Sequence, residues 1–263
     1  MTGALHSSVK RYRELARNSP KNGLERELLL DGAHLLIEAR KSGVVVDSAA
    51  FEDSVLKDAA MRQLAEALAG DGADVYIVSR KTLESMSPVK TPAGVVAIAR
   101  RSYVPLDAAF AGTDAPLVVV AHEVQDPGNV GGIMRTAEAA GATAFVTTHA
   151  TADPLGWKAL RGSMGSALRV PIVRADLDDT MDALRAFRIA TSALVPRDGR
   201  RLFDSDFRRA SAVLLGGEGG GLPARVLERV NQRVSIPMRA PVESLNVGIA
   251  AALVLYEAFR QRQ

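Results

Sequence analysis

The stretch from Leu214 to Pro223 reads LLGGEGGGLP, an apolar run followed by five glycines that surround one glutamate. The apolar run predicts a buried strand, and the glycines predict a turn at its carboxyl end. Glycine lets a backbone approach a ligand closely and adopt positive φ angles. Turn chemistry alone gives no reason for a glutamate at this place. We therefore expect Glu218 to contact a ligand.

A second stretch of small residues, Asp126–Arg135, reads DPGNVGGIMR and follows a strand predicted at Leu117–Val120. In α/β folds, ligands bind at the carboxyl ends of such strands. Asn129 fits the N-cap of the next helix, with a ligand contact as the alternative. Arg135 lies about two turns into that helix, where either an exposed ion pair or a functional arginine fits.

A third stretch consists of Ile236–Met238 and of the residues that open the last predicted helix, Leu245–Arg260. Ser244 is predicted to be the N-cap of this helix. Asn246 has a poor helix propensity just inside it, which indicates a specific hydrogen bond. Apolar residues share one face of the helix at helical spacing, namely Leu245, Ile249, Leu253 and Tyr256.

The chain is expected to form two α/β units. Residues from Arg101 to Pro116 mix Pro, Asp, Gly and Thr without periodicity, which predicts a boundary there. Strands and helices alternate after this segment, as in a mostly parallel sheet. We therefore divide the chain into residues 1–105 and 106–263.

Composition excludes several classes of protein. Of 263 residues, 47% are apolar and 24% are charged, which is typical of a folded protein. The absence of cysteine excludes disulfides, thiolate ligands and cysteine nucleophiles. The four histidines show no metal-ligand spacing, so no metal is expected. Because the sequence lacks an apolar run of membrane-spanning length and an apolar signal core, we expect a soluble cytoplasmic protein.

Basic residues gather near the N-terminus, among them Arg11, Arg13 and Lys21, in a chain of net charge +3. Such a cluster predicts either a phosphate-binding surface or a solvated helix face. A dinucleotide fingerprint is weakly matched by Gly219, Gly221 and Ala224. That fingerprint normally opens the first βα unit of its domain, which counts against a nicotinamide-dependent oxidoreductase.

Taken in order, the three stretches resemble the three motifs of the SpoU (TrmH) family of RNA ribose 2′-O-methyltransferases, in the SPOUT superfamily, over roughly Leu117–Arg260. The preceding unit resembles the substrate-binding domain often fused to these enzymes, through LLLDGAHLLIEA at 28–39 and TPAGVVA at 91–97. The resemblance implies an α/β SPOUT domain with a mostly parallel sheet and a deep trefoil knot. A smaller α/β domain, like a ribosomal protein and binding RNA, would precede it.

The resemblance further implies a homodimer that uses S-adenosylmethionine, without a metal, to methylate a ribose 2′-hydroxyl of structured RNA. Ribosomal RNA is favoured over transfer RNA. A transfer-RNA ribose methyltransferase and a catalytically inactive RNA-binding homologue are the alternatives. Catalytic roles are expected for Arg135, Asn129, Glu218, Ser244 and Asn246. Cofactor contacts are expected from Thr191, Leu194, Gly216, Gly217, Gly221, Ile236 and Leu245. RNA contacts are expected from Arg11, Arg13, Lys21 and Arg161.

Overall fold

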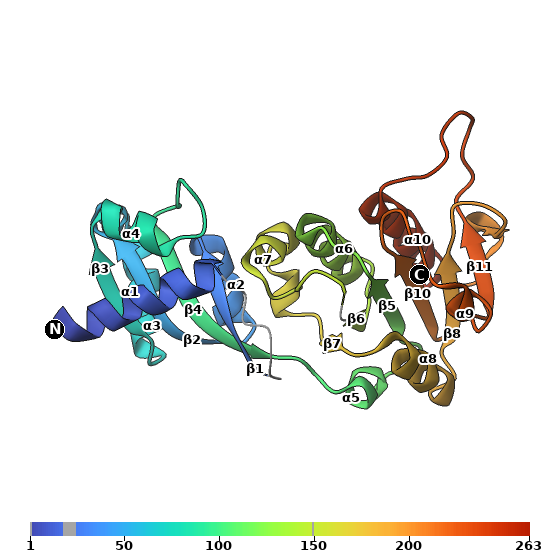
Figure 1. The fold of residues 1–263 in the computed structure, drawn as a ribbon. Helices are drawn as coiled ribbons and strands as arrows, with labels where there is room; N and C mark the ends of the chain where they lie inside the picture. The colour runs from blue at the N-terminus through green and yellow to red at the C-terminus, as the bar shows by residue number, and fades with distance from the viewer. Residues whose placement is uncertain (1, 18–24, 149) are drawn as a thin grey trace. The chain divides into compact units, whose positions relative to one another are not determined.

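The structure is a computed structural model that describes residues 2–17, 25–148 and 150–263. The chain forms two compact units (Figure 1). Unit 1 comprises Met1–Ser102 and Leu155–Arg169, and unit 2 comprises Tyr103–Pro154 and Val170–Gln263. The first crossing between units falls within the predicted boundary segment. The sequence predicts two units that are each continuous in the chain. In the structure, residues 155–169 instead belong to unit 1.

Unit 1 is a four-stranded sheet with helices, in the order β1-β4-β2-β3. Strand β4 is antiparallel to β1 and β2, whereas β2 and β3 are parallel. Its elements are α1 (Thr2–Arg17), β1 (Glu25–Asp31), α2 (Ala33–Lys41), β2 (Val45–Glu52), the 3-10 helix η1 (Asp53–Lys57), α3 (Ala59–Gly70), β3 (Asp74–Val78), α4 (Arg80–Met86), β4 (Val95–Ser102), α7 (Trp157–Ser163) and η2 (Ser166–Leu168).

The core of unit 1 joins three distant parts of the chain. Helix α1 buries Tyr12 and Leu15 against the sheet, and the Tyr12 hydroxyl lies 2.9 Å from Ser48 Oγ. Burial raises the pKa of Tyr12, so this phenol stays neutral. Trp157 packs against the same core. Helix α7 contacts β1, and Leu160 is fully buried, which explains why 155–169 belongs to unit 1.

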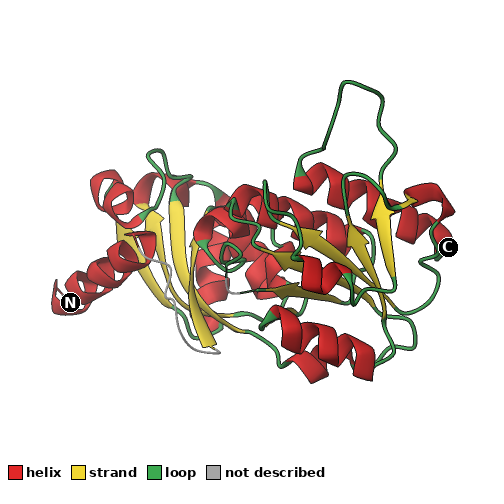
Figure 2. Cartoon of the chain, turned by 45° about the vertical axis from the view of Figure 1, so that its right-hand side comes forward, coloured by secondary structure: helices red, strands yellow, loops and turns green. Residues whose placement is uncertain are grey.

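Unit 2 is a parallel sheet in the order β7-β6-β5-β10-β8-β11-β9, and it confirms the predicted α/β class. Figure 2 shows helices on both sides of this sheet. Its elements are α5 (Leu106–Phe110), β5 (Leu117–His122), α6 (Pro127–Ala139), β6 (Ala144–Thr147), β7 (Ile172–Arg174), α8 (Leu177–Ala186), β8 (Ala190–Leu194), β9 (Arg200–Arg201), η3 (Leu202–Asp204), β10 (Ser211–Gly216), α9 (Ala224–Leu227), β11 (Gln232–Ser235) and α10 (Val247–Gln261).

The central strands of unit 2 are buried on both faces. Every residue of β5 is buried, as a continuous β-branched run predicts for a strand covered by helices. Alternate residues of the strands, such as Val118 and Val120, share one core cluster with Phe110 of α5, Met181 of α8 and Val226 of α9. Helix α10 packs against α6 and β10. No helix in the described ranges is long and apolar enough to cross a membrane.

The start of α10 corrects the sequence prediction. The helix begins at Val247, and its N-cap is Asn246 rather than Ser244. The Asn246 Oδ1 atom accepts hydrogen bonds from the backbone N–H groups of Gly248 (2.9 Å) and Ile249 (3.3 Å). Serine and asparagine are both favoured caps, and only the backbone geometry distinguishes them here.

The predicted apolar face of α10 points to solvent. Ile249, Leu253 and Tyr256 are 56%, 44% and 52% exposed. The helix instead buries a second apolar face against unit 2, made of Val247, Ala250, Ala251, Val254, Leu255 and Ala258. Because α10 is apolar on two faces, spacing alone does not identify the one that meets the core.

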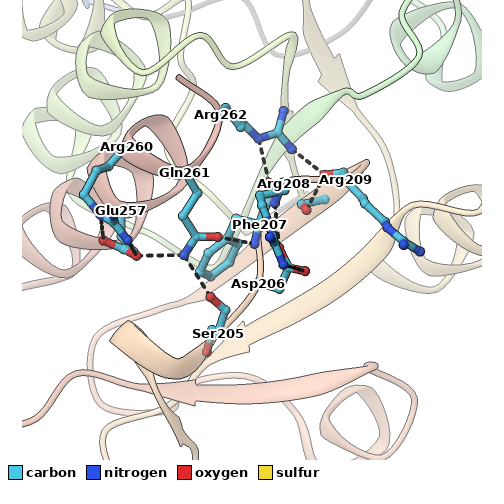
Figure 3. A network of polar contacts seen from close by, with 10 residues as sticks. Ser205, Asp206, Phe207, Arg208, Arg209, Glu257, Arg260, Gln261 and Arg262 are labelled. Atoms are coloured by element: carbon cyan, nitrogen blue, oxygen red, sulfur yellow. Dashed lines mark hydrogen bonds and ion pairs between the residues drawn. The ribbon is translucent and has the colours of Figure 1, made fainter.

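The end of α10 is tied to the chain that leads into the sheet (Figure 3). Gln261 accepts a hydrogen bond from the backbone N–H of Phe207 (2.8 Å) and donates to the carbonyl oxygen of Ser205 (2.9 Å). The Arg262 guanidinium donates to four carbonyl oxygens, those of Ala115, Pro116, Phe207 and Arg209. These contacts hold the helix against the entrances to β5 and β10.

Candidate active site

The predicted motifs meet at one edge of the unit 2 sheet. Strand β10 ends at Gly216, which lies opposite His122, the last residue of β5. The neighbouring strand β8 ends at Leu194, and Ile236 follows β11 directly. All these strands are parallel, so their carboxyl ends lie together. This is the edge where α/β proteins bind ligands.

The glycine turn after β10 requires glycine for steric reasons. A Cβ atom on Gly216 would lie 2.3 Å from the carbonyl carbon of Gly221, and one on Gly217 would lie 2.3 Å from the carbonyl oxygen of Glu123. Gly219 and Gly221 have φ angles of 92° and 63°, which side chains disfavour. The Gly221 N–H donates to the Gly217 carbonyl (3.1 Å), so the turn closes on itself.

A cavity of about 470 Å³ opens beside this turn. Its volume falls in the range of small-molecule sites, roughly 300–1,000 Å³. Six of the seven predicted cofactor residues line it, namely Leu194, Gly216, Gly217, Gly221, Ile236 and Leu245. The wall also includes Met238, from the third stretch, and Val195 and Pro196, which were not predicted from the sequence. Proline is a turn signal, and Pro196, two residues after the end of β8, is the sequence feature that could have indicated this part of the wall.

Thr191 does not lie at this cavity, which corrects the expectation for that residue. It sits near the amino end of β8, whereas the cavity lies at the carboxyl end. Its backbone N–H and its hydroxyl both donate to Asn231 Oδ1, at 2.8 and 2.9 Å. A strand rises about 3.3 Å per residue, so three residues are enough to separate Thr191 from Leu194.

A chain of hydrogen bonds joins three predicted catalytic residues from distant parts of the sequence. Asn129 Nδ2 donates to Glu218 Oε1 at 2.7 Å. Asn246 Nδ2 donates to Asn129 Oδ1 at 3.2 Å. The Asn246 Oδ1 atom is already occupied as the cap of α10, so its amide orientation is fixed. Both Glu218 and Asn246 line the cavity. The network therefore forms a preorganised polar edge on an otherwise apolar pocket.

Asn129 is free to join this network because another residue caps α6. The Asp126 Oδ1 atom accepts a hydrogen bond from the Asn129 backbone N–H at 2.8 Å and serves as the N-cap. The capping interpretation of Asn129 is therefore wrong. Ser244, the fourth expected catalytic residue, also lines the cavity, two residues before the cap of α10.

Arg135 lies on α6, six residues after Asn129, and its side chain is exposed. Among the residues that the structure describes, it forms no ion pair and no side-chain hydrogen bond. Arg135 thus does not form a surface ion pair with any residue that the structure describes. Its exposed guanidinium is available for an anionic ligand.

His122 ends β5 next to the glycine turn and is buried. Its Nδ1 atom lies 3.1 Å from Thr148 Oγ1, and its Nε2 atom lies 3.5 Å from Glu123 Oε1. Burial lowers the pKa of His122, against the opposing effect of Glu123. These contacts give His122 a packing role at the end of β5.

The predicted RNA-contact residues lie in unit 1 and have different surroundings. Arg11 forms ion pairs with Glu27 and Asp47, which reduce its availability for phosphate. Arg13 Nη2 donates to Ser85 Oγ at 2.9 Å. Arg161 is exposed in the last turn of α7. Lys21 lies outside the described residues.

Metal ligands are not grouped in this protein as far as the structure describes it: no three or more His, Cys, Asp or Glu side chains there could hold a metal ion. The polar edge and the glycine turn define an α/β protein with a small-molecule site.

Comparison with known proteins gives the family. The SpoU rRNA Methylase family matches residues 116–256, and the MRM3-like substrate binding domain matches residues 7–97. The chain therefore belongs to the SpoU rRNA Methylase family.

Similar proteins extend over the whole chain. An uncharacterized tRNA/rRNA methyltransferase of Synechocystis is 34% identical, covering 100% of this chain and 94% of its own. The 23S rRNA (guanosine(2553)-2′-O)-methyltransferase RlmP of Bacillus subtilis is 28% identical, covering 96% of each chain. Among solved structures, the AdoMet-bound rRNA methyltransferase from Sinorhizobium meliloti has a TM-score of 0.85 and 28% identity. It covers 96% of this chain and 94% of its own.

Proposed function

We propose that this protein transfers a methyl group from S-adenosylmethionine to a ribose 2′-hydroxyl of RNA, with ribosomal RNA as the preferred substrate. The observation that carries the proposal is the hydrogen-bonded chain Asn246–Asn129–Glu218 at the edge of the glycine-walled cavity. Methyltransferases of ribosomal RNA among the relatives support the substrate class. The three polar residues argue against an inactive homologue, because a pure binding module has no need of them.

The cavity suits S-adenosylmethionine in volume and in the chemistry of its lining. Leu194, Ile236 and Leu245 offer apolar walls for a purine ring, and Gly216 and Gly217 line the same cavity. The polar edge lies on one side only, which suits a ligand with an apolar base and a charged amino-acid end. When bound, the cofactor supplies an electrophilic methyl carbon on a positively charged sulfur.

The protein must bring the ribose 2′-oxygen to that carbon and remove its proton. In the transfer, a bond from the methyl carbon to the ribose oxygen would form as its bond to sulfur breaks, the demethylated cofactor would leave with the sulfur electron pair, and the hydroxyl proton would pass to solvent. Arg135 is a poor base, because a guanidinium stays protonated at neutral pH. We assign it the binding of the adjoining phosphate and ribose, where its charge also favours the oxygen as it loses its proton. Asn129, held between Glu218 and Asn246, keeps the edge of the site in one geometry.

A homodimer is part of the proposal. The exposed stripe Ile249, Leu253 and Tyr256 on α10 gives a continuous apolar face on the helix that begins at the site. Exposed apolar patches of this kind mark interaction surfaces. The family resemblance also implies a trefoil knot. The segments that would form it, 216–221 and 236–246, both contribute to the wall of one cavity.

The proposal is tested by transfer of a labelled methyl group to RNA. The protein is incubated with S-adenosylmethionine and either ribosomal RNA or transfer RNA, and 2′-O-methyl sites are mapped. Arg135→Ala is expected to lower turnover roughly 10²-fold or more, the scale of a positioned catalytic group. Cofactor affinity is expected to change little, because the cavity wall does not include Arg135.

Arg201→Ala removes another exposed arginine of unit 2 and is the matched control. Wild-type turnover in Arg135→Ala would contradict the assigned role. Binding of a nicotinamide nucleotide in place of S-adenosylmethionine would contradict the whole proposal, and methylation confined to transfer RNA would change its substrate.

A further inference from the structure

A separate cavity lies at the opposite end of β8 from the candidate active site. It measures about 270 Å³ and has an apolar wall that includes the buried side chains of Met181 and Ile189. Thr191 contributes to this cavity, whereas Leu194, three residues further along the strand, contributes to the glycine-walled one. The two cavities are therefore distinct, and the proposed methyl transfer makes no use of this one.

Three arginines line the cavity, and two of them have unmatched charges. Arg229 donates to Asp178 Oδ1 at 2.8 Å and to Asp182 Oδ1 at 2.5 Å, so its charge is neutralised within the fold. Arg185 and Arg188 are exposed, and neither has an ion pair or a side-chain hydrogen bond with any residue that the structure describes. The cavity therefore presents two guanidinium groups to solvent.

The backbone at Arg188 has a left-handed conformation that favours glycine. Arg188 follows the C-cap of α8 with a φ angle of 56°, and the next residue, Ile189, donates its N–H to the Leu184 carbonyl at 2.9 Å. Glycine is the usual residue in this type of helix ending, since a Cβ atom is strained there. Arginine is thus a costly choice for the backbone.

A fixed amide donor completes the polar part of the cavity. Asn231 Oδ1 accepts two hydrogen bonds from Thr191, at 2.8 and 2.9 Å, which sets the orientation of the amide. Its Nδ2 atom has no acceptor among the described residues. Two guanidinium groups and a held amide beside an apolar wall offer several hydrogen-bond donors, which suits the oxygens of a phosphate.

We propose that this cavity binds one phosphate of RNA, with part of the attached nucleoside against the apolar wall. Guanidinium groups pair with phosphate oxygens through two parallel hydrogen bonds. The volume is close to the lower limit for small-ligand sites, about 300 Å³, which suits a single nucleotide unit. The proposal rests on RNA being the substrate, and it adds a second point of RNA attachment remote from the reacting ribose.

The first test is RNA binding by the full-length protein, measured as fluorescence anisotropy of a labelled single-stranded RNA over a range of salt concentrations. Arg185→Gln/Arg188→Gln is expected to bind roughly 10-fold more weakly at low salt, with a salt slope smaller by about 0.7, the value for one phosphate contact on a single strand. Arg200→Gln/Arg201→Gln removes the same charge from exposed positions outside the cavity. Equal losses in the two double variants would overturn the proposal, because net charge would then explain both.

The second test separates binding from folding. Arg188→Gly relieves the backbone strain, so it is expected to raise the unfolding temperature while it weakens RNA binding. Weaker binding by a more stable protein cannot result from unfolding. RNA affinity equal to that of the wild type in this variant would contradict the proposal.

The third test locates the ligand. Uridine 5′-monophosphate is expected to shift the side-chain Nε–Hε resonances of Arg185 and Arg188, and uridine or inorganic phosphate at the same concentration to shift them less. Equal shifts with inorganic phosphate would overturn the nucleotide part, since the cavity would then bind any phosphate.

Methyl transfer is measured in parallel, so that the two proposals fail separately. Nucleotide-induced shifts without methyl transfer would refute the proposed function alone. If the protein transfers the methyl group but the Arg185 and Arg188 substitutions leave RNA binding unchanged, only the second site is refuted.

Discussion

At the scale of single residues, Asn246 has two functions in one amide group. Its oxygen caps α10 through Gly248 and Ile249, and its nitrogen donates to Asn129. Asn129 in turn donates to Glu218. The start of the last helix and the polar edge of the cavity therefore depend on the same side chain.

Substitutions of Asn246 are expected to separate these functions. Asn246→Ala loses both and is expected to lower the free energy of unfolding by about 1 kcal/mol, the usual effect of losing a cap. Asn246→Asp keeps a cap oxygen but loses the donor to Asn129. It is expected to stay within a few tenths of a kcal/mol of the wild type, while methyl transfer falls as far as in Asn246→Ala. Urea unfolding and turnover are the measurements. Wild-type turnover in Asn246→Asp would show that the bond to Asn129 is dispensable.

At the scale of one element, α10 is used on all sides. One face of the helix packs on the sheet, and the exposed stripe faces solvent. The N-cap, Asn246, belongs to the polar edge of the cavity. At the other end, Gln261 and Arg262 bond to the chain before β10. A change in this helix therefore has effects that depend on the face it touches.

The exposed stripe is expected to be the dimer contact. Leu253→Glu/Tyr256→Glu places two charges on it, and charges are costly to bury without partners. We expect a monomer by sedimentation velocity at concentrations where the wild type is a dimer. Phe203→Glu alters another exposed apolar residue of unit 2 and is expected to leave the dimer intact. A monomeric wild type at high concentration would contradict the assignment of the stripe.

The last turn of α10 is expected to stabilise unit 2 as a whole. Arg262→Ala removes a charged donor from four carbonyl oxygens. Hydrogen bonds from charged groups contribute about 1.5–3 kcal/mol each, and because Arg262 is only half-buried we expect a total loss of roughly 2–4 kcal/mol. Hydrogen exchange is expected to accelerate in β5 and β10 and to stay unchanged in β1. Arg208→Ala, whose partner is the neighbouring Asp206, is the control.

At the scale of the whole molecule, unit 1 is assembled from two separate parts of the chain. Leu155–Arg169 leaves unit 2 after β6 and returns to it before β7. Leu160 is fully buried in α7, and Trp157 packs on the core around Tyr12 and Leu29. The first 102 residues therefore lack part of their own core.

Fragments are expected to reveal this dependence. Residues 1–102 alone should be less stable than the same residues joined to 155–169 by a flexible linker. Burial of Leu160 alone contributes about 1.5–3 kcal/mol. Trp157 is the only tryptophan, so its fluorescence reports docking of the added segment directly. Equal stability of the two fragments would show that α7 is not part of the unit 1 core.

The sequence was sufficient for those features that depend on local chemistry. Glycines at 216 and 217 marked the cavity, because close backbone approaches exclude a Cβ atom and leave a visible pattern. Thr191 was misplaced, because it lies three residues before Leu194 and only the carboxyl end of β8 meets the cavity. The membership of 155–169 in unit 1 was not predictable, since it depends on contacts with β1 more than 100 residues earlier.

The divided unit 1 has a consequence for synthesis. A protein chain leaves the ribosome from its N-terminus, and domains generally fold as units once their residues have emerged. Unit 1 cannot complete its core until Arg169 is out, when β5 and β6 of unit 2 have already been made and β10 has not. Unit 1 therefore stays incomplete while residues 103–169 are translated. During this time the core around Tyr12 is partly uncovered, and chaperones would bind it. Genetic exchange is constrained in the same way, because no single cut in the gene releases unit 1 intact.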